Sequence, residues 1–239
     1  MLSFVLKRRD LKEFDQVVAL FSAEKGKIEV LAKGVKKVIA KNSAYLEPFF
    51  LIEAEIVEGK EVWHLTKAVP VESFKNIRAN LEKSLIAGYI CEVLNVILPE
   101  RAAEKKIFDL VFGFLNYLEN TKEANRVLII SFLWKSLCLL GFLPTLKNCV
   151  ICGEDKETKY FSAFHGGCVC EDCKSKTIET NNMLFFNTQE KQSLKLLITG
   201  LWPQIKMSEE DLEKQEKLLF IFCAYHSEKK IPLPSPLLK

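Results

Sequence analysis

The sequence predicts an α+β protein in which a small β domain is followed by an α-helical domain. Short β-rich runs separated by turn residues occupy about the first seventy positions. From about Ser73 onward, apolar residues recur at steps of three and four, the period of a helix that buries one face. Two cysteine pairs then interrupt the helical pattern. We therefore expect a β domain over residues 1–72 and a helical domain over residues 73–239, with a cysteine module, residues 146–178, inserted in the second.

The β domain consists of five short runs that are rich in β-branched and aromatic residues. They lie at residues 4–6, 16–21, 27–31, 49–57 and 61–65, a pattern typical of a small barrel or sandwich. Glu58, Gly59 and Lys60 separate the last two runs and predict a hairpin turn. Five strands are consistent with an OB-like barrel, although strand count alone does not determine the topology.

The periodicity of the helical part predicts one long first helix, which begins near Ser73 and is stopped by Pro99. Further helices are expected over residues 102–118, 124–140, 188–201 and 209–228. Ser208 precedes three acidic residues, the order expected of a helix cap and its first turn. The apolar residues assigned to one buried face of the first helix are Phe74, Ile77, Leu81 and Leu85.

The cysteine module contains two Cys-x-x-Cys pairs separated by seventeen residues, Cys149 with Cys152 and Cys170 with Cys173. This spacing is typical of a zinc site. Two thiolates three positions apart on a tight turn reach the same ion, and a second pair completes a tetrahedron. Four thiolates leave no open position for water or substrate. The sequence therefore predicts one structural Zn²⁺ held by these four cysteines.

Other assignments of these thiols stay open at this point. Cys168 offers a second thiolate near Cys170, which we prefer because it forms a pair with Cys173, and His165 is a weaker substitute ligand. Two disulfides would need an oxidising compartment, and the N-terminal residues show no secretory signal. A degenerate, metal-free remnant is the remaining alternative. The other cysteines fall on apolar helical stretches and are expected in the core: Cys91, Cys138 and Cys223.

Positive charge is concentrated in one part of the β domain. The formal net charge of +3 does not by itself indicate a polyanion partner. Between residues 25 and 41, however, six lysines accompany a single acid, Glu29. Such a loop suits phosphate groups, because each lysine that neutralises a phosphate releases a condensed counterion. Lys7, Arg8 and Arg9 extend the track, and the alternative is a solvated lysine-rich loop. The six lysines are Lys25, Lys27, Lys33, Lys36, Lys37 and Lys41.

Aromatic residues that could stack on nucleic-acid bases occur in the same part of the chain. We expect most of them in the barrel core rather than on a stacking surface. They are Phe14, Phe21, Phe49, Phe50 and Trp63.

The sequence lacks the motifs of several enzyme classes. Its two Gly-Lys dipeptides lack the second glycine and the hydroxyl residue of a nucleotide-binding loop, and no Gly-x-Gly-x-x-Gly occurs. The zinc motifs of metalloproteases and deaminases are absent as well. No apolar run approaches the roughly 20 residues of a membrane span. We therefore expect a protein that is not an enzyme. The three histidines are scattered along the chain: His64, His165 and His226.

Two separated stretches are similar to the signatures of a known family. The first includes Phe4-Val5-Leu6-Lys7, Glu24-Lys25-Gly26-Lys27 and Leu31-Ala32-Lys33-Gly34-Val35-Lys36-Lys37. The second includes Cys149-x-x-Cys152-Gly153, Gly166-Gly167 and Cys170-x-x-Cys173. Together they resemble RecO, the family of bacterial recombination mediators, and the second stretch is similar to the zinc module of members that retain one. The resemblance covers the layout of nearly the whole chain.

The resemblance implies an N-terminal OB-fold followed by a helical domain that carries the zinc module. It also implies a cytoplasmic, nucleoid-associated protein that binds single- and double-stranded DNA, anneals complementary strands, and with RecR helps RecA replace SSB. Family members are neither nucleases nor ATPases. One departure is the C-terminal end, where prolines at 232, 234 and 236 replace a basic and apolar tail. The implied DNA-binding residues are Lys33, Lys36, Lys37, Lys41 and Arg8.

Two other hypotheses remain at this point. In the first, the chain is a zinc-containing scaffold whose helices and knuckle hold partner proteins and whose barrel binds no DNA. In the second, it is a zinc-dependent enzyme that acts on nucleic acid, which requires an open coordination position on the metal.

Overall fold

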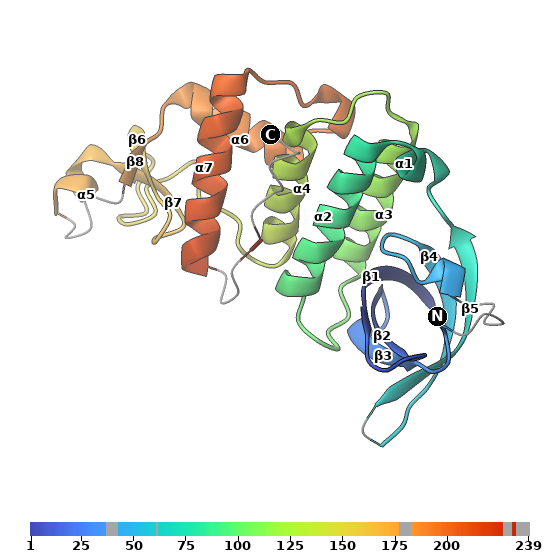
Figure 1. The fold of residues 1–239 in the computed structure, drawn as a ribbon. Helices are drawn as coiled ribbons and strands as arrows, with labels where there is room; N and C mark the ends of the chain where they lie inside the picture. Colours follow the sequence, from blue (N-terminus) through green and yellow to red (C-terminus); the bar gives the residue numbers. More distant parts are fainter. Residues whose placement is uncertain (37–42, 61, 177–182, 227–230, 233–239) are drawn as a thin grey trace. The chain divides into compact units, whose positions relative to one another are not determined.

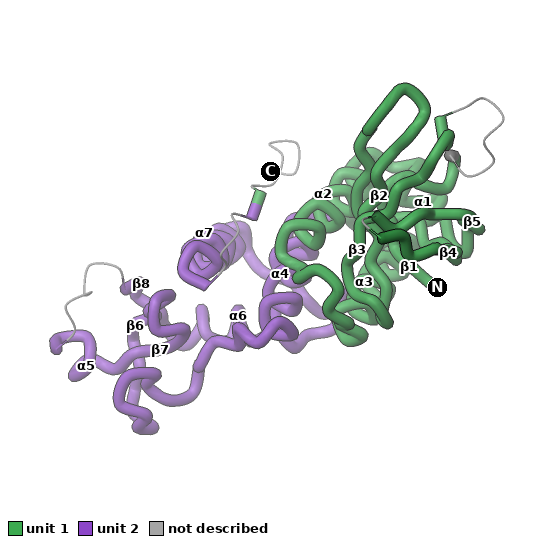
Figure 2. Tube along the Cα trace, turned by 90° about the horizontal axis from the view of Figure 1, so that it is seen from below, with its two compact units in different colours: residues 1–124, 232–239 green, residues 125–231 purple. Residues whose placement is uncertain are grey.

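The computed structural model describes residues 1–36, 43–60, 62–176, 183–226 and 231–232 (Figure 1). The chain separates into two compact units, residues 1–124 with 232–239, and residues 125–231 (Figure 2). Among the described residues, the first unit contains the β strands of the N-terminal part together with three α-helices. The boundary expected after residue 72 falls at the end of the last of these strands, within the first unit, and independent folding of residues 1–72 stays a prediction.

The N-terminal strands form the closed five-stranded barrel of an OB-fold, with strand order β1-β2-β3-β5-β4. The pairing of β3 with β5 is parallel and the other pairings are antiparallel. The predicted hairpin turn at Glu58 to Lys60 lies between β4 and β5, which confirms that prediction. The strands are β1 (Leu2–Asp10), β2 (Gln16–Ser22), β3 (Gly26–Ala32), β4 (Leu51–Val57) and β5 (Trp63–Glu72).

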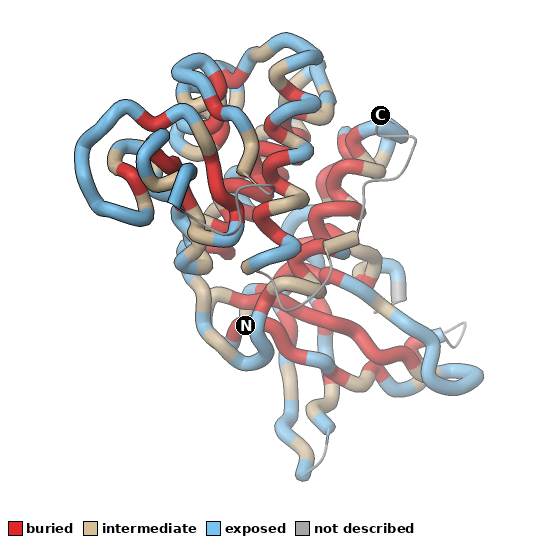
Figure 3. The backbone as a smooth tube through the Cα atoms, turned by 90° about the vertical axis from the view of Figure 1, so that its left-hand side faces the viewer, coloured by how far each residue is buried: buried red, intermediate tan, exposed pale blue. Residues whose placement is uncertain are grey.

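Every residue of strand β2 is buried, because both faces of the strand are covered. In Figure 3 the buried residues, drawn in red, run through both the strands and the helices. Val18 and Leu20 belong to the core cluster of the barrel. Phe21 instead contacts Phe108 of α3 (Lys105–Asn120), with 5.9 Å between ring centroids, and Phe4 of β1 lies 5.0 Å from the same ring. This double burial explains why residues 17–21 form a continuous apolar run in the sequence rather than an alternating one.

The long first helix expected from Ser73 to Pro99 is wrong as a single element. The chain forms α1 (Lys75–Ala79) and α2 (Leu81–Ile97), separated by Asn80 in an extended conformation with φ −122° and ψ 122°. The Asn80 side chain accepts a hydrogen bond from the backbone N–H of Lys83 at 3.0 Å, so it starts a new helix instead of continuing the old one. Leu81, expected on the buried face, is 71% exposed.

Two charged side chains bind α1 and α2 to the end of α3. The Glu119 carboxylate accepts hydrogen bonds from the backbone N–H groups of Asn76 at 2.8 Å and Ile77 at 2.9 Å, at the N-terminus of α1. The buried Lys83 ammonium donates to the carbonyl oxygens of Glu119 at 3.3 Å and Thr121 at 2.5 Å, at the C-terminus of α3. Each charge has the sign that the local helix dipole favours.

The second unit is built around α4 (Arg126–Leu139), whose residues are buried on nearly every side. Trp134 of α4 packs against Phe222 of α7 (Glu209–His226), with 5.2 Å between ring centroids. The Lys135 ammonium donates to the carbonyl oxygens of Ile198 and Gly200 at 2.9 and 2.8 Å, where α6 (Thr188–Thr199) ends. These contacts hold the three helices together within the unit.

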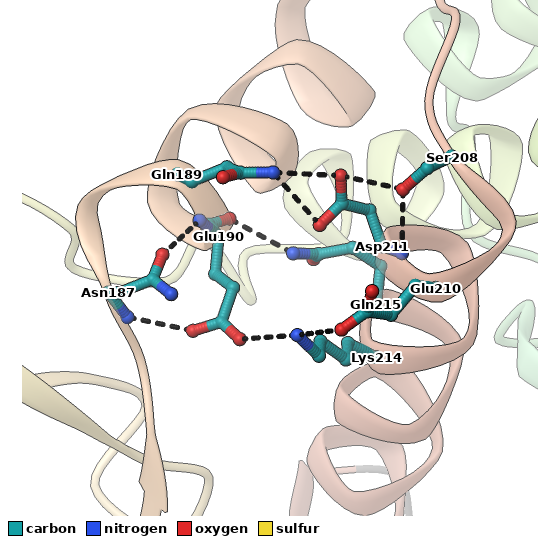
Figure 4. A network of polar contacts seen from close by, with 8 residues as sticks. All are labelled: Asn187, Gln189, Glu190, Ser208, Glu210, Asp211, Lys214 and Gln215. Atoms are coloured by element: carbon teal, nitrogen blue, oxygen red, sulfur yellow. Dashed lines mark hydrogen bonds and ion pairs between the residues drawn. The ribbon is translucent and has the colours of Figure 1, made fainter.

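A polar network joins the N-terminal ends of α6 and α7 (Figure 4). Asn187 and Glu190 form a reciprocal capping box at the start of α6. The buried Gln215 side chain of α7 donates to the carbonyl oxygen of Glu190 at 2.9 Å. Ser208 accepts a hydrogen bond from the backbone N–H of Asp211 at 3.2 Å, which confirms the predicted cap of α7.

The turn between β2 and β3 provides a stability test for the first unit. Gly26 has φ +66°, and a Cβ atom added there would lie 1.9 Å from the carbonyl oxygen of Ala102. We expect Gly26→Ala to lower the free energy of unfolding by about 2 kcal/mol or more, because left-handed backbone and a backbone clash both oppose it. Gly113→Ala is the matched control. Gly113 lies within α3, and a Cβ atom added there would have nothing within 4 Å. This substitution should raise the free energy of unfolding by about 1 kcal/mol, because alanine favours a helix more than glycine does. Urea denaturation measures the free energy of unfolding of both variants. Equal changes in the two variants would contradict the prediction.

Candidate nucleic-acid interface and metal centre

The cysteine module is a small three-stranded sheet with one short helix. The strands are β6 (Thr158–Ser162), β7 (Gly167–Cys170) and β8 (Met183–Phe185), in the order β7-β6-β8. Cys149 and Cys152 lie on the turn that precedes β6. Cys170 is the last residue of β7, and Cys173 lies on α5 (Glu171–Lys176). Gly153 has φ +76°, and its N–H donates to the Cys149 carbonyl at 2.8 Å, which closes the first turn.

The four predicted cysteines converge on one point. The sulfur atoms of Cys149, Cys152, Cys170 and Cys173 all lie within 4.8 Å of one another, so the group could hold a metal ion. A tetrahedral zinc site with Zn–S bonds of about 2.3 Å needs sulfur atoms about 3.8 Å apart, and this cluster is close to that size. The sulfur atoms of Cys149 and Cys170 belong to buried residues, whereas Cys152 is exposed. The donor set and its spacing fit Zn²⁺.

Ionisation of these thiols without a cation is unequal. Burial opposes ionisation of Cys149, but hydrogen bonds from the backbone N–H groups of Cys152, Cys170 and Ile151 lower its pKa to about 6. Desolvation and hydrogen bonds with the neighbouring thiols raise the pKa of Cys173 to about 12. A bound dication removes this conflict because it stabilises all four thiolates at once.

Cys168 and His165 lie outside the four-cysteine cluster. Cys168 is fully buried, and its backbone pairs with Thr145 through an N–H···O bond of 2.7 Å. The His165 ring is 2.9 Å from the Ser162 hydroxyl. Elsewhere, Cys91 and Cys223 are buried and Cys138 is half-buried, and burial raises their pKa values to about 12, 12 and 11 respectively. These three thiols pack in the helical parts as predicted.

The module is attached to the helices of its unit at several points. Phe161 of β6 packs against Phe222 of α7, with 6.2 Å between ring centroids. The Lys191 ammonium of α6 donates to both the carbonyl and the hydroxyl oxygen of Thr158, the latter at 2.7 Å. His226 at the end of α7 lies 2.6 Å from the carbonyl oxygen of Ala163. Loss of order in the module would therefore disturb α6 and α7.

A second candidate site lies on the barrel, where the predicted basic residues Arg8 and Lys36 meet. They line a depression of about 560 Å³ together with Arg9, Asp10 and Gln16. The loop that carries Lys36 is hydrogen-bonded to the β1–β2 loop, because the backbone N–H of Lys36 donates to the Phe14 carbonyl at 3.1 Å. The N–H of Gly34 likewise donates to the Asp15 carboxylate at 2.7 Å.

Each cation of this depression is paired with an acid. Lys36 lies 2.7 Å from Asp10, Arg8 lies 2.5 Å from Glu47, and Arg9 lies 3.3 Å from Glu29. The hydrogen bonds that Asp10 accepts from Lys36 and then Gln16 lower the pKa of its carboxyl group. Surface ion pairs of this kind contribute little stability, so a phosphate group can replace the carboxylates at low cost.

The remaining lysines of the predicted track have different surroundings. Lys33 is exposed just after β3, where its ammonium can reach a ligand. Lys27 is buried, with its ammonium donating to the Asn95 carbonyl at 2.8 Å, so it is unsuited to phosphate contact. Lys25 lies 2.8 Å from Glu58. Lys37 and Lys41 lie outside the described residues.

Within the described part of the chain, no helix is both long and apolar enough to cross a membrane.

Comparison with known sequences identifies the family. Residues 3–74 match the family described as Recombination protein O N terminal, and residues 78–235 match Recombination protein O C terminal. The chain belongs to the RecO family. The OB-fold barrel, followed along the chain by the helical region, therefore agrees with both the sequence resemblance and the matched families.

Curated relatives of the RecO family cover most of the chain. A protein named DNA repair protein RecO from Desulforamulus reducens is 30% identical over 235 residues, which cover 96% of this chain and 90% of the relative. One of the same name from Thermoanaerobacter sp. is 28% identical over 229 residues, which cover 95% of this chain and 91% of the relative. A third, from Dehalococcoides mccartyi, is 32% identical over 175 residues, covering 72% and 69%.

The four-cysteine cluster predicts a direct link between metal content and stability. We expect Cys170→Ser to lose bound metal and to lower the free energy of unfolding by about 4 kcal/mol or more, because metal binding and folding are coupled in such modules. Cys168→Ala is the matched control, since it changes a buried cysteine outside the cluster and should keep the metal. Elemental analysis and thermal denaturation measure the two quantities. A Cys170→Ser protein that lost metal but kept its melting temperature would show that the ion does not brace the fold.

Proposed function

We propose that this RecO-family chain is a DNA repair and recombination mediator that performs no catalysis itself. It binds single- and double-stranded DNA, anneals complementary strands, and with RecR helps load RecA onto single strands coated with SSB. It acts in the bacterial cytoplasm at the nucleoid. The observation that carries the proposal is the convergence of Arg8, Arg9 and Lys36 on one depression of the OB barrel, in a chain whose relatives are named DNA repair proteins.

The basic residues are proposed to bind phosphate groups rather than base edges. Lysine and arginine charges on a shallow depression neutralise phosphates without reading sequence. Such contacts suit annealing, because neutralised strands repel one another less and their bases stay free to pair. The proposed phosphate-binding residues are Arg8, Lys33, Lys36, Lys37 and Lys41, with Arg9 added because it lines the same depression.

Zn²⁺ is the metal that we propose for the four-cysteine cluster. Four thiolates satisfy its tetrahedral preference, and they leave no position at which it could activate water. Its role is therefore to hold the module, and through Thr158, Phe161 and Ala163 the helices α6 and α7, in place. This assignment disfavours the alternative of a zinc-dependent enzyme.

We propose that a groove of the second unit binds the tail of SSB. A groove of about 450 Å³ has an apolar side formed by Leu143, Pro144 and Leu146. Lys195 lies along the same groove and is exposed, so the groove suits a short peptide that is apolar and negatively charged. The other lining residues are Lys147, Thr188, Lys191, Gln192, Ile198 and Thr199.

Replacing Lys33, Lys36 and Lys37 together by alanine should weaken binding of single-stranded DNA. Each lost phosphate contact should also flatten the dependence of log affinity on log salt by roughly 0.7. Fluorescence anisotropy with a labelled oligonucleotide at several salt concentrations measures both quantities. Unchanged affinity and slope would remove this loop from the interface, as the scaffold hypothesis predicts.

Asp10→Asn is a control that should act in the opposite direction. Its carboxylate pairs with Lys36 at 2.7 Å and competes with phosphate for that ammonium. The amide keeps an oxygen that can accept from Gln16 but carries no charge, so we expect tighter DNA binding. Weaker binding by Asp10→Asn would mean that the ion pair positions Lys36 for DNA rather than competing with it.

Annealing of complementary strands coated with SSB tests the function as a whole. The wild-type chain with RecR should anneal them, and Lys195→Glu should fail on coated strands but succeed on naked ones, because only the coated reaction needs the SSB contact. Fluorescence quenching between two labelled strands follows the reaction. Failure of the wild-type chain on both substrates would refute the mediator function, whereas normal annealing by Lys195→Glu on coated strands would refute the groove alone.

A further inference from the structure

The barrel has a second hollow, which shares no residue with the depression around Lys36. It has a volume of about 320 Å³ and lies beside the start of β5. Trp63, the first residue of β5, forms part of its wall and is partly exposed, while its other side packs against the barrel core. The other lining residues are Met1, Lys25, Ala54, Glu55, Ile56 and Glu58. The expectation that Trp63 belongs to the core therefore describes only one side of its ring.

Two cations lie against the indole of Trp63. The Lys25 ammonium is 4.8 Å from the ring centroid, and the Arg101 guanidinium carbon is 5.4 Å from it. Cation–π contacts at exposed positions contribute only about 0.5–1 kcal/mol each. Lys25 is also held by Glu58 at 2.8 Å, an exposed pair that a phosphate can replace.

Arg101 is held in this position by its backbone. Its φ of +57° is unfavourable for a residue with a side chain. A hydrogen bond from its N–H to the Lys27 carbonyl at 2.9 Å and a β-bridge between Glu100 and Lys27 maintain the conformation. Arg101 is exposed, so core packing of its own side chain does not explain the strain. The turn instead fixes the backbone of Arg101 at a point from which its guanidinium lies beside Trp63.

These groups can bind the base and the phosphate of one nucleotide. An indole face stacks on any base, in an interaction worth about 1–3 kcal/mol per base. Arg101 and Lys25 can bind the adjoining phosphate, and the carboxylates of Glu55 and Glu58 can accept hydrogen bonds from exocyclic amino groups. A volume near 300 Å³ is at the lower end of ligand pockets, which suits one base rather than a stacked run.

We propose that this hollow, the base pocket, takes one unpaired base of a DNA single strand, stacked on Trp63 with its phosphate on Arg101 and Lys25. The inference rests on the proposed DNA-binding function and adds a distinction to it. Phosphate contacts around Lys36 bind single and double strands alike, whereas the base pocket accepts only a base that has left its stack. It therefore gives the chain a preference for single strands.

Tryptophan fluorescence tests the base pocket directly. The chain has three tryptophans. Trp134 is fully buried, and Trp202 is removed by Trp202→Phe, so that Trp63 is the residue that responds. In this background we expect a thymidine oligonucleotide to quench the fluorescence of Trp63. A duplex, or an abasic oligonucleotide, should bind without quenching it. Trp63→Leu should abolish the quenching and weaken single-strand binding by about 5- to 150-fold while duplex binding stays within about twofold. Trp63→Phe should restore most of the affinity.

Arg101→Gln keeps the test decisive if Trp63→Leu does not fold. Arg101 is exposed, so the fold should tolerate the substitution. Loss of the guanidinium should reduce the affinity for single strands more than the affinity for duplex. The base pocket is refuted if single strands bind the wild-type chain without quenching Trp63, or if Arg101→Gln binds single strands and duplex like wild type. A wild-type chain that binds neither would refute the proposed function itself, and the base pocket with it.

Discussion

Closure of the barrel by parallel pairing of β3 with β5 is the constraint on which the N-terminal unit depends. The contact is short, with Val30 opposite Trp63 and Leu31 opposite His64, yet it converts a sheet with two edges into a barrel without any. The chain leaves β3 toward the loop that carries Lys33 and Lys36, and it enters β5 at Trp63. The same pairing therefore positions both the depression around Lys36 and the base pocket. Without it, β3 with the basic loop and β5 with the indole would be the two opposite edges of one open sheet.

Much of this arrangement could be predicted from local patterns, and the rest depends on pairs that are distant in sequence. Strand runs and cysteine spacing are local signals, so the five strands and the four-cysteine cluster were predicted correctly. The break at Asn80 was missed because the apolar period continues through it, while the capping bond to Lys83 decides the backbone. The acids opposite Arg8 and Lys36 were missed for another reason. Glu47 and Asp10 lie on other segments, and a count of charge along one loop does not include them. The two-sided environment of Trp63 also requires tertiary structure, because Arg101 approaches it from the α2–α3 connection.

The ion pairs make the surface around Lys36 less positive than the number of lysines in the sequence suggests. The depression around Lys36 is a set of exposed ion pairs rather than a bare positive surface. Binding of a phosphate there exchanges one anion for another, so the net gain is smaller than the number of cations implies, and the displaced carboxylates return to water. Such a site would bind phosphate reversibly and without sequence preference. Both properties would suit the proposed annealing function, in which the chain holds a strand and then releases it into a duplex.

Phosphate contacts alone, however, distinguish poorly between a strand that still needs a partner and one that already has one, since both present a backbone of phosphate groups. A stacking site makes that distinction by geometry, because a paired base is unavailable to Trp63 until it leaves the helix, at a cost of a few kcal/mol. Annealing would then remove the base from the pocket, and the chain would keep only its phosphate contacts to the product. The free energy of base pairing would thus drive release from the tighter of the two binding modes. The proposed mediator would then need no nucleotide hydrolysis to turn over.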